Sequence, residues 1–430
     1  MSKIDFDEYL MQGRALLGNS KYEDAISYFN KAELEDNMNE DVYLYKGICY
    51  ANMDKYLEAK NEFEKVLKIS KNNGLACFHL GNIENLMGNR ARGIELYNNA
   101  LAYGFDDAQV YYSLGLMFEE DGDDDKAVRN YSKAIIKDPN RADVRLRKVS
   151  ILVRNNKRQE ALQSLDELIL SNPDIFEGYH LKFLMLVEDK EYDKAEATID
   201  SAMELFPKDP AFKLDKASLL TSKEQYDEAL EALKAIEEET TVYPQLAHDI
   251  AMERTRIYTG KQDPKTLIHY LEEARNISRE NDVQDFEESF LLMNCYVVEN
   301  DFNKVLDMAR YLKSVEGNEY YTLSANYYEG FALKNLGDTD GAKKLFEAAA
   351  DFYRKKTLEF PTNLDIYSFR IMSLRELGQL DKALELADYL VKANDKSPEA
   401  HVLKSSVLEA LGKDNEAEQE RKQAELLKQA

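Results

Sequence analysis

Small residues recur in this chain at a fixed spacing of 34 positions. A first small position holds glycine in four successive segments, at Gly13, Gly47, Gly81 and Gly115. A second small position keeps the same spacing, at Ala25, Ala59, Gly93, Ala127, Ala161, Ala195 and Ala229. Self-similarity at a fixed period of this length indicates a stack of similar units. Each unit buries its apolar face against its neighbours.

One unit, residues 108–141, shows how the pattern corresponds to helices. Apolar residues recur at helical spacing in both halves of the unit, which predicts two helices. Gly122 stands where the first helix should end in a left-handed cap, and Pro139 cannot continue the second helix. Gly115 lies inside the first helix, where glycine costs about 1 kcal/mol relative to alanine. We therefore expect Gly115 to be a contact point that lets the second helix approach closely.

The pattern resembles the tetratricopeptide repeat family. The resemblance rests on a large–Leu–Gly–aromatic motif and an Ala–aromatic–Ala–Pro motif, seen at Tyr111, Leu114, Gly115, Phe118, Ala127, Tyr131, Ala134 and Pro139. It covers nearly the whole chain. It implies an all-α fold, a right-handed superhelical solenoid of about twelve helix-turn-helix units. In this family the first helices line a concave face that often binds a peptide or a partner helix.

The repeats divide the chain into three parts. Residues 6–243 hold seven regular units of 34 residues, and residues 244–285 form an irregular unit where we expect a change of curvature. Four further units, residues 286–430, end in a polar helix that we expect to be a cap. We predict a longer inner turn around residues 259–264. About seven extra residues precede Pro361, and these should lengthen a helix by nearly two turns.

Two repeats depart from the glycine pattern. Val149 and Phe183 replace the contact glycine in the fifth and sixth units. A larger side chain at this position should hold the two helices of the unit further apart.

Charge and composition exclude several classes of function. The chain has 81 acidic and 56 basic residues, a net charge of -25, which argues against nucleic-acid binding because phosphate contacts need clustered Lys and Arg. The longest apolar run is too short for a membrane span, and the first residues do not resemble a secretory signal. Three scattered cysteines are typical of reduced thiols, so we expect a cytoplasmic protein.

No catalytic constellation stands out in the sequence. The five histidines are far apart, and no phosphate-binding loop, dinucleotide fingerprint, HExxH or Cys-x-x-Cys motif occurs. The repeats leave no room for a separate enzyme domain. We therefore expect no enzymatic activity, no cofactor and no metal site.

The expected partner-binding groove is lined by residues of the first helices that face the concave side. The candidates are Phe78, Asn82, Asn85, Tyr112, Leu116, Leu146, His180, Leu184, Phe290, Asn294, Tyr327 and Phe331. Asparagines could hydrogen-bond a peptide backbone, and aromatic residues commonly serve as anchors. The alternative is that the apolar members pack against the next repeat, and the sequence leaves this open.

A basic segment, residues 141–158, follows an acidic one, residues 119–125. The candidates for a basic patch are Arg145, Arg147, Lys148, Arg154, Lys157 and Arg158. Stacking of adjacent units would place the acidic turn against Arg154, Lys157 and Arg158. Two interpretations follow, mutual neutralisation between repeats or a basic site for an acidic partner.

The sequence thus favours a non-catalytic scaffold that binds a protein or peptide segment in its concave groove. A cytosolic receptor for a short signalling peptide and a self-assembling structural subunit are the alternatives, so a homo-oligomer is possible. One branch of the family clamps the acidic tails of heat-shock chaperones with lysine and asparagine. Repeat one has Leu10 and Arg14 at those places, which disfavours that partner.

Overall fold

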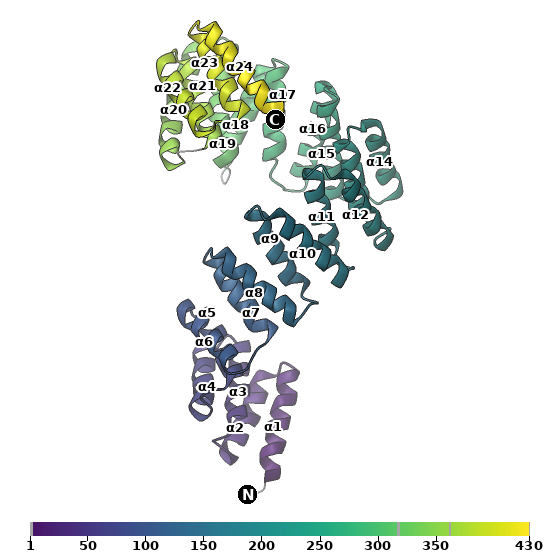
Figure 1. Cartoon of the computed structure of the whole chain (residues 1–430), viewed down its shortest axis with the longest axis vertical. Coiled ribbons are helices and arrows are strands. Elements are labelled where there is room, and N and C mark those ends of the chain that lie inside the picture. Colours follow the sequence, from purple (N-terminus) through teal and green to yellow (C-terminus); the bar gives the residue numbers. More distant parts are fainter. Residues whose placement is uncertain (1–2, 316–318, 361–362, 430) are drawn as a thin grey trace. The chain divides into compact units, whose positions relative to one another are not determined.

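The computed structural model describes residues 3–315, 319–360 and 363–429. These residues form 24 α-helices, and no β-strand occurs among them. The helices follow one another as twelve helix-turn-helix pairs (Figure 1). The predicted all-α repeat fold is therefore confirmed.

The chain consists of two compact units, Met1–Lys208 and Asp209–Ala430. The first contains α1 (Lys3–Gly18), α2 (Tyr22–Glu35), α3 (Glu40–Asn52), α4 (Tyr56–Ile69), α5 (Gly74–Leu86), α6 (Arg90–Ala102), α7 (Ala108–Glu120), α8 (Asp124–Lys137), α9 (Ala142–Arg154), α10 (Arg158–Ser171), α11 (Phe176–Glu188) and α12 (Tyr192–Leu205). The second contains α13 (Pro210–Ser222), α14 (Tyr226–Glu239), α15 (Pro244–Gly260), α16 (Pro264–Glu280), α17 (Phe286–Val298), α18 (Phe302–Ser314), α19 (Glu319–Asn335), α20 (Thr339–Glu359), α21 (Leu364–Glu376), α22 (Leu380–Ala393), α23 (Pro398–Ala410) and α24 (Asp414–Gln429). The predicted three-part grouping of the repeats stays a prediction.

The inner turns end the first helices as the sequence predicts. Gly122 has a φ of 74°, the left-handed conformation of a helix cap, and Asp123 then accepts a hydrogen bond from the Lys126 backbone N–H at the start of α8. In the next repeat the same turn position holds Asn156, with a φ of 55°. The turn therefore needs a residue in the left-handed backbone conformation, and residues other than glycine also adopt it here.

The contact glycine works as expected. A Cβ atom built on Gly115 would lie 2.5 Å from Cε1 of Tyr131 on α8, well inside van der Waals contact. Among the seven regular repeats, the helix pairs with glycine at this position approach each other most closely. The pairs with Val149, Phe183 and Ala217 at this position approach each other less closely. Close approach within a regular repeat thus accompanies glycine at this position.

The irregular repeats lengthen their helices. The extra residues around 259–264 were expected in the turn, and this prediction is wrong, because α15 continues to Gly260 and α16 begins at Pro264, each with 17 residues. About four added residues make one helical turn, which keeps the apolar face aligned and the backbone hydrogen-bonded. The other insertion behaves as predicted, since α20 has 21 residues.

The first helices lie on the inner side of each unit. Among the described residues, neighbouring first helices approach each other, as α1–α3 and α3–α5 do in one unit and α19–α21 and α21–α23 in the other. No two second helices come together to the same extent in those ranges. The second helices therefore spread apart, which leaves grooves between them on the outer side. At the end of the chain, α24 buries Ala417 and Ala424 and exposes most other side chains, as a cap should.

Candidate binding surfaces

One repeat position on the first helices forms a stripe across the first unit. Its members are 34 residues apart and each is half-buried or exposed: Ile48, Asn82, Leu116, Ser150 and Leu184. Leu184 is 42% exposed, and Val153 on α9 is 40% exposed. The stripe is thus a mixed apolar and polar surface that solvent, or a partner, can reach.

Two of the predicted groove residues lie in the core instead. Phe78 is 7% exposed and packs against Tyr97 and Phe105, with ring centroids 6.0 and 5.4 Å away. Tyr327 is 1% exposed and stacks on Phe331 at 5.9 Å. Their assignment to an open groove is corrected here. Their large rings fill the space between neighbouring helices, which removes them from water.

The other predicted groove residues stay at least partly accessible. The first unit brings together Asn82, Asn85, Tyr112, Leu116, Leu146, His180 and Leu184, while Phe290, Asn294 and Phe331 belong to the second unit. Asn82 is held in place, because its Oδ1 accepts a hydrogen bond of 2.7 Å from the Tyr97 hydroxyl. Tyr112 is covered on one face by the guanidinium of Arg141, 4.6 Å from the ring centroid.

The predicted basic patch is largely neutralised by carboxylates. The Arg154 Nε atom lies 3.1 Å from Asp124, and the Lys157 amine lies 3.0 Å from Asp125, so the acidic turn stacks on the next repeat as expected. Arg158 differs from the expectation. It contacts Asp189 at 2.5 Å, in the following repeat, because the start of α10 faces the end of α11.

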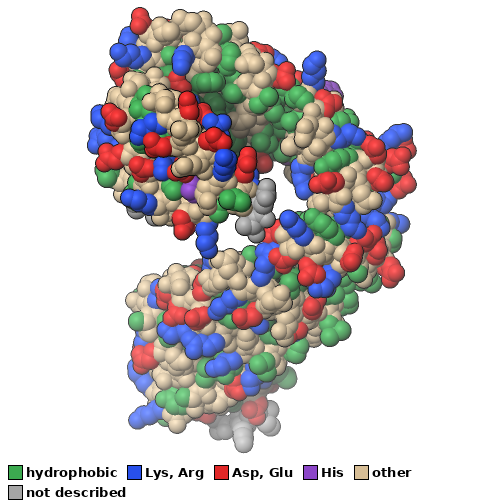
Figure 2. Space-filling model, turned by 45° about the horizontal axis from the view of Figure 1, so that its top comes forward, with side chains coloured by type: hydrophobic (Ala, Val, Ile, Leu, Met, Phe, Trp, Pro, Cys, Tyr) green, Lys and Arg blue, Asp and Glu red, His purple; other side chains and the backbone are tan. Residues whose placement is uncertain are grey.

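Two of the remaining candidates of the basic patch are also paired with carboxylates. Arg145 is 7% exposed and pairs with Glu167 at 3.1 Å, and Arg147 lies 3.6 Å from Glu119. Lys148 is half-buried. Figure 2 shows acidic and basic side chains interspersed over the face it presents. The Arg147 contact joins two repeats and the Arg145 contact stays within one repeat, so both support neutralisation over a free basic surface.

A groove of about 660 Å³ lies between the second helices α10 and α12, with α11 as its floor. Tyr179 and Leu186 of α11 form the buried part of the floor, and Ile169 contributes an apolar wall. The sequence did not predict this groove, because the predicted binding residues lie on the first helices only. Phe183 was the sequence feature that could have indicated the groove, since a large side chain at this position is expected to increase the distance between α11 and α12.

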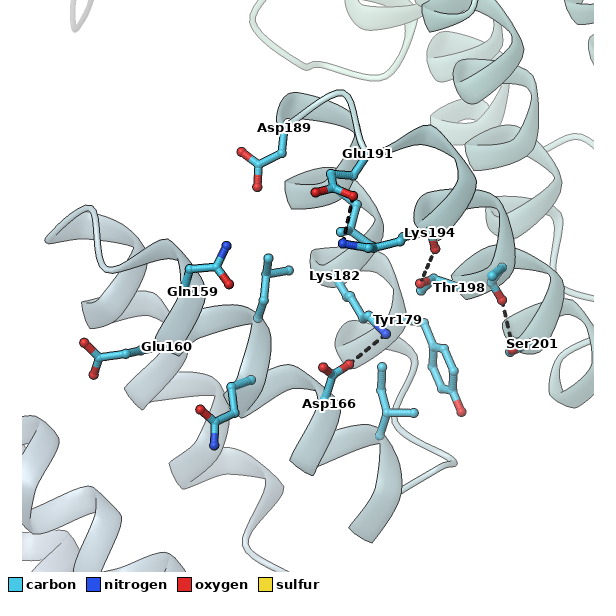
Figure 3. Close-up of a pocket in the computed structure, with 15 residues that line it drawn as sticks. Gln159, Glu160, Asp166, Tyr179, Lys182, Asp189, Glu191, Lys194, Thr198 and Ser201 are labelled. Atoms are coloured by element: carbon cyan, nitrogen blue, oxygen red, sulfur yellow. Dashed lines mark hydrogen bonds and ion pairs between the residues drawn. The ribbon is translucent and has the colours of Figure 1, made fainter.

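Polar side chains line the rest of this groove. Asp166 of α10 and Lys182 of α11 point toward one another and form an ion pair of 2.7 Å (Figure 3). Lys194 pairs with Glu191 at 2.8 Å, and the Thr198 hydroxyl donates to the Lys194 carbonyl. The groove therefore combines an apolar floor with charged walls whose lysines are already paired.

A smaller cavity of about 210 Å³ in the second unit adjoins a buried charge cluster. Glu288, 4% exposed, accepts a hydrogen bond from the Ser278 hydroxyl at 2.7 Å and contacts Nε2 of His248 at 2.6 Å. Hydrogen bonds to Asp249 and Glu288 raise the pKa of His248 to about 9, against the effect of burial. Burial would raise the pKa of Glu288, but hydrogen bonds from His248 and Ser278 hold it below its usual range.

Glu288 is the centre of this cluster. The same carboxylate oxygen accepts a hydrogen bond from the Ser278 hydroxyl and contacts His248. The cluster therefore links α15, α16 and α17 by charge-assisted hydrogen bonds.

Comparison with known families identifies the repeats. A tetratricopeptide repeat model matches residues 10–74, 87–142 and 370–424, and a second model of the same description matches residues 186–248. Together these matches cover more than half of the chain. The chain belongs to the tetratricopeptide repeat family. Repeats of this family generally mediate contacts between proteins.

Several tetratricopeptide repeat proteins are similar to this one. The TPR repeat-containing protein MJ1428 of Methanocaldococcus jannaschii is 22% identical over 54% of this chain and 42% of its own length. The BBSome complex member BBS4 of Bos taurus is 20% identical over 72% of this chain and 60% of its own length. The chain thus spans less than two thirds of the length of these curated relatives.

Solved structures also resemble parts of the chain. MamA from Desulfovibrio magneticus RS-1 has a TM-score of 0.36 and 21% identity, over 41% of this chain and 99% of its own. The C-terminal part of a TPR repeat-containing protein from Cytophaga hutchinsonii has a TM-score of 0.44 and 17% identity, over 63% of this chain and 95% of its own.

Two further observations concern the described residues of this tetratricopeptide repeat chain. Within residues 3–315, 319–360 and 363–429, no helix is both long and apolar enough to cross a membrane. In the same ranges, no three His, Cys, Asp or Glu side chains gather in a way that could hold a metal ion.

Proposed function

We propose that this tetratricopeptide repeat protein is a non-catalytic scaffold that binds a peptide or protein segment along the inner surface of its first helices. The stripe of Ile48, Asn82, Leu116, Ser150 and Leu184 carries the proposal. Each repeat contributes one accessible side chain to it, so an extended segment can contact several repeats at once.

The chemistry of the stripe suits a protein segment. Leu116 and Leu184 offer apolar contacts, and burying a leucine side chain contributes about 1.5–3 kcal/mol. Asn82 is fixed by Tyr97 and Asn85 lies three residues further along the same helix. Amide side chains can hydrogen-bond the backbone of a bound segment whatever its sequence. Apolar side chains on the segment would then set its position.

The test begins with affinity capture of the full chain and identification of a bound protein by mass spectrometry. The double variant Leu116→Ser, Leu184→Ser should weaken binding of that protein, since both side chains lie on the stripe. Ile136→Ser serves as the matched control, because Ile136 is 76% exposed on the second helix α8. Equal binding by the double variant and the control would remove the stripe from the proposal.

The same material separates the alternative functions. Saturable binding of a short free peptide from the identified partner would favour a peptide receptor. A mass that grows with protein concentration in light scattering would favour a self-assembling subunit.

A further inference from the structure

The groove between α10 and α12 exists for a physical reason. The second helices α10 and α12 do not pack on each other, and α11 and α12 approach each other less closely than the helix pairs that carry glycine at the position of Phe183. Space therefore opens above Tyr179, Lys182 and Leu186 of α11. The groove has a volume of about 660 Å³.

Two exposed leucines lie on the wall helices, beyond the residues that line the groove. Leu170, near the end of α10, follows Asp166 by one helical turn and is 86% exposed. Leu205, at the end of α12, follows Ser201 by one turn and is 53% exposed. Because residues four apart share a helix face, both leucines continue the two lines of side chains that form the groove walls. They would add apolar contacts for a ligand that extends past the lining residues.

One end of the groove is acidic. Glu160 at the start of α10, Asp189 at the end of α11 and Glu191 before α12 lie there (Figure 3). Four carboxylates and two lysines line the whole groove. Among the described residues, Asp166 and Glu191 each pair with one of these lysines and Asp189 pairs with Arg158, which leaves Glu160 to attract a basic ligand.

We propose that this groove docks an amphipathic helix of a partner protein, with apolar residues against Leu170 and Leu205 and with Lys or Arg toward Glu160. The walls are two second helices with a third helix beneath them, so their side-chain ridges suit the packing of another helix. Helix-in-groove recognition uses apolar residues at i, i+3 and i+4 of the bound helix, so one face of a partner helix could contact both leucines. This outer site is separate from the inner surface of the proposed function.

The probe is a fluorescein-labelled synthetic helix of about five turns, rich in alanine. Leucines occupy one face at one end and lysines occupy the same face at the other end. Fluorescence anisotropy with the full chain measures its dissociation constant. We expect saturable binding, weaker by about tenfold or more in the Leu170→Ser, Leu205→Ser variant, because both side chains lose their apolar contact. Glu160→Lys should weaken binding by about threefold and reduce its salt dependence.

Matched controls are available at equivalent repeat positions. Ile136→Ser changes an exposed residue 34 positions before Leu170, outside the groove, and Glu228→Lys makes the same charge change in the other unit. Both should bind like the unchanged protein, as should the stripe variant Leu116→Ser, Leu184→Ser.

Any of four results would overturn the proposal. These are the absence of saturable binding, an equal loss in Ile136→Ser, equal binding of a probe with Glu in place of Lys, and equal binding of a probe interrupted by proline. If the stripe variant Leu116→Ser, Leu184→Ser still bound a captured partner, that result would count against the proposed function and would leave the groove proposal unaffected.

Discussion

Gly115→Ala is the sharpest test of how this repeat packs. The added methyl carbon would lie 2.5, 2.6 and 3.1 Å from three ring carbons of Tyr131, where carbon atoms normally keep about 3.5–4.0 Å. Tyr131 cannot easily yield, because it is fully buried and its hydroxyl is hydrogen-bonded to Glu119. Inserting a methyl group into such a site costs about 1–3 kcal/mol.

Helix propensity acts in the opposite direction. Alanine is better than glycine inside a helix by about 1 kcal/mol, so the net effect should be a destabilisation on the order of 1 kcal/mol. Gly18→Ala is the control. Gly18 ends α1, and a methyl group added there would meet nothing within 4 Å, so this change should stabilise α1 by up to about 1 kcal/mol.

Hydrogen exchange measured by mass spectrometry on the full chain provides the local readout. A repeat array can open region by region, so a single unfolding midpoint would average the effect. Exchange in α7 and α8 should accelerate in Gly115→Ala, and exchange in α1 should slow in Gly18→Ala. Slower exchange in α7 and α8 would refute the argument that close packing offsets the cost of glycine.

Three further predictions concern charges and turns. Asp285→Ala should destabilise α16–α18 by about 3–5 kcal/mol, measured by hydrogen exchange. Asp285 is 1% exposed, and two arginines, whose Nε atoms lie 2.6 and 2.7 Å from its carboxylate, would lose their partner. Because the pKa of His248 is raised, the contribution of His248 to stability is complete below about pH 6.5 and is lost as the pH rises through about 9. Because the pKa of Glu288 is lowered, the contribution of Glu288 is complete above about pH 4.3 and is lost in acid. His248→Gln should therefore remove the alkaline loss from a pH series of urea melts, and a persistent loss would contradict the assignment. Gly122→Ala should lower the free energy of unfolding by about 1–2 kcal/mol, because alanine is disfavoured in the left-handed conformation. Gly122→Asn should lower it less, because Asn156 adopts the same conformation in the next repeat. Equal losses of stability in thermal melts of the two variants would disprove this.

The sequence predicted the parts of this molecule that depend on local pattern. The period of 34, the turn at Gly122 and the wide helix pair at Phe183 follow from residue type and spacing, since each effect acts between neighbours in a hairpin. The turn near residue 260 was predicted wrongly, because a sequence pattern does not say whether an insertion joins a helix or a loop. The free energy of a continued backbone hydrogen-bond ladder decided that case.

Accessibility at the candidate sites depended on contacts between repeats. Phe78 and Leu184 stand on comparable helix faces in the sequence. Phe78 packs against rings of its own repeat and joins a buried cluster that includes Val110 and Leu114 of the next repeat, whereas Leu184 remains in contact with water. Arg158 likewise pairs with the following repeat rather than with the preceding one.

The sequence by itself determined the repeat, its two helices and its all-α class, because helical periodicity and small contact residues are properties of short segments. Only the tertiary structure decided which side chains are accessible and where the groove between α10 and α12 opens. Those features depend on how far apart helices from different repeats lie, a distance set by the packing of side chains that are remote from one another in the sequence.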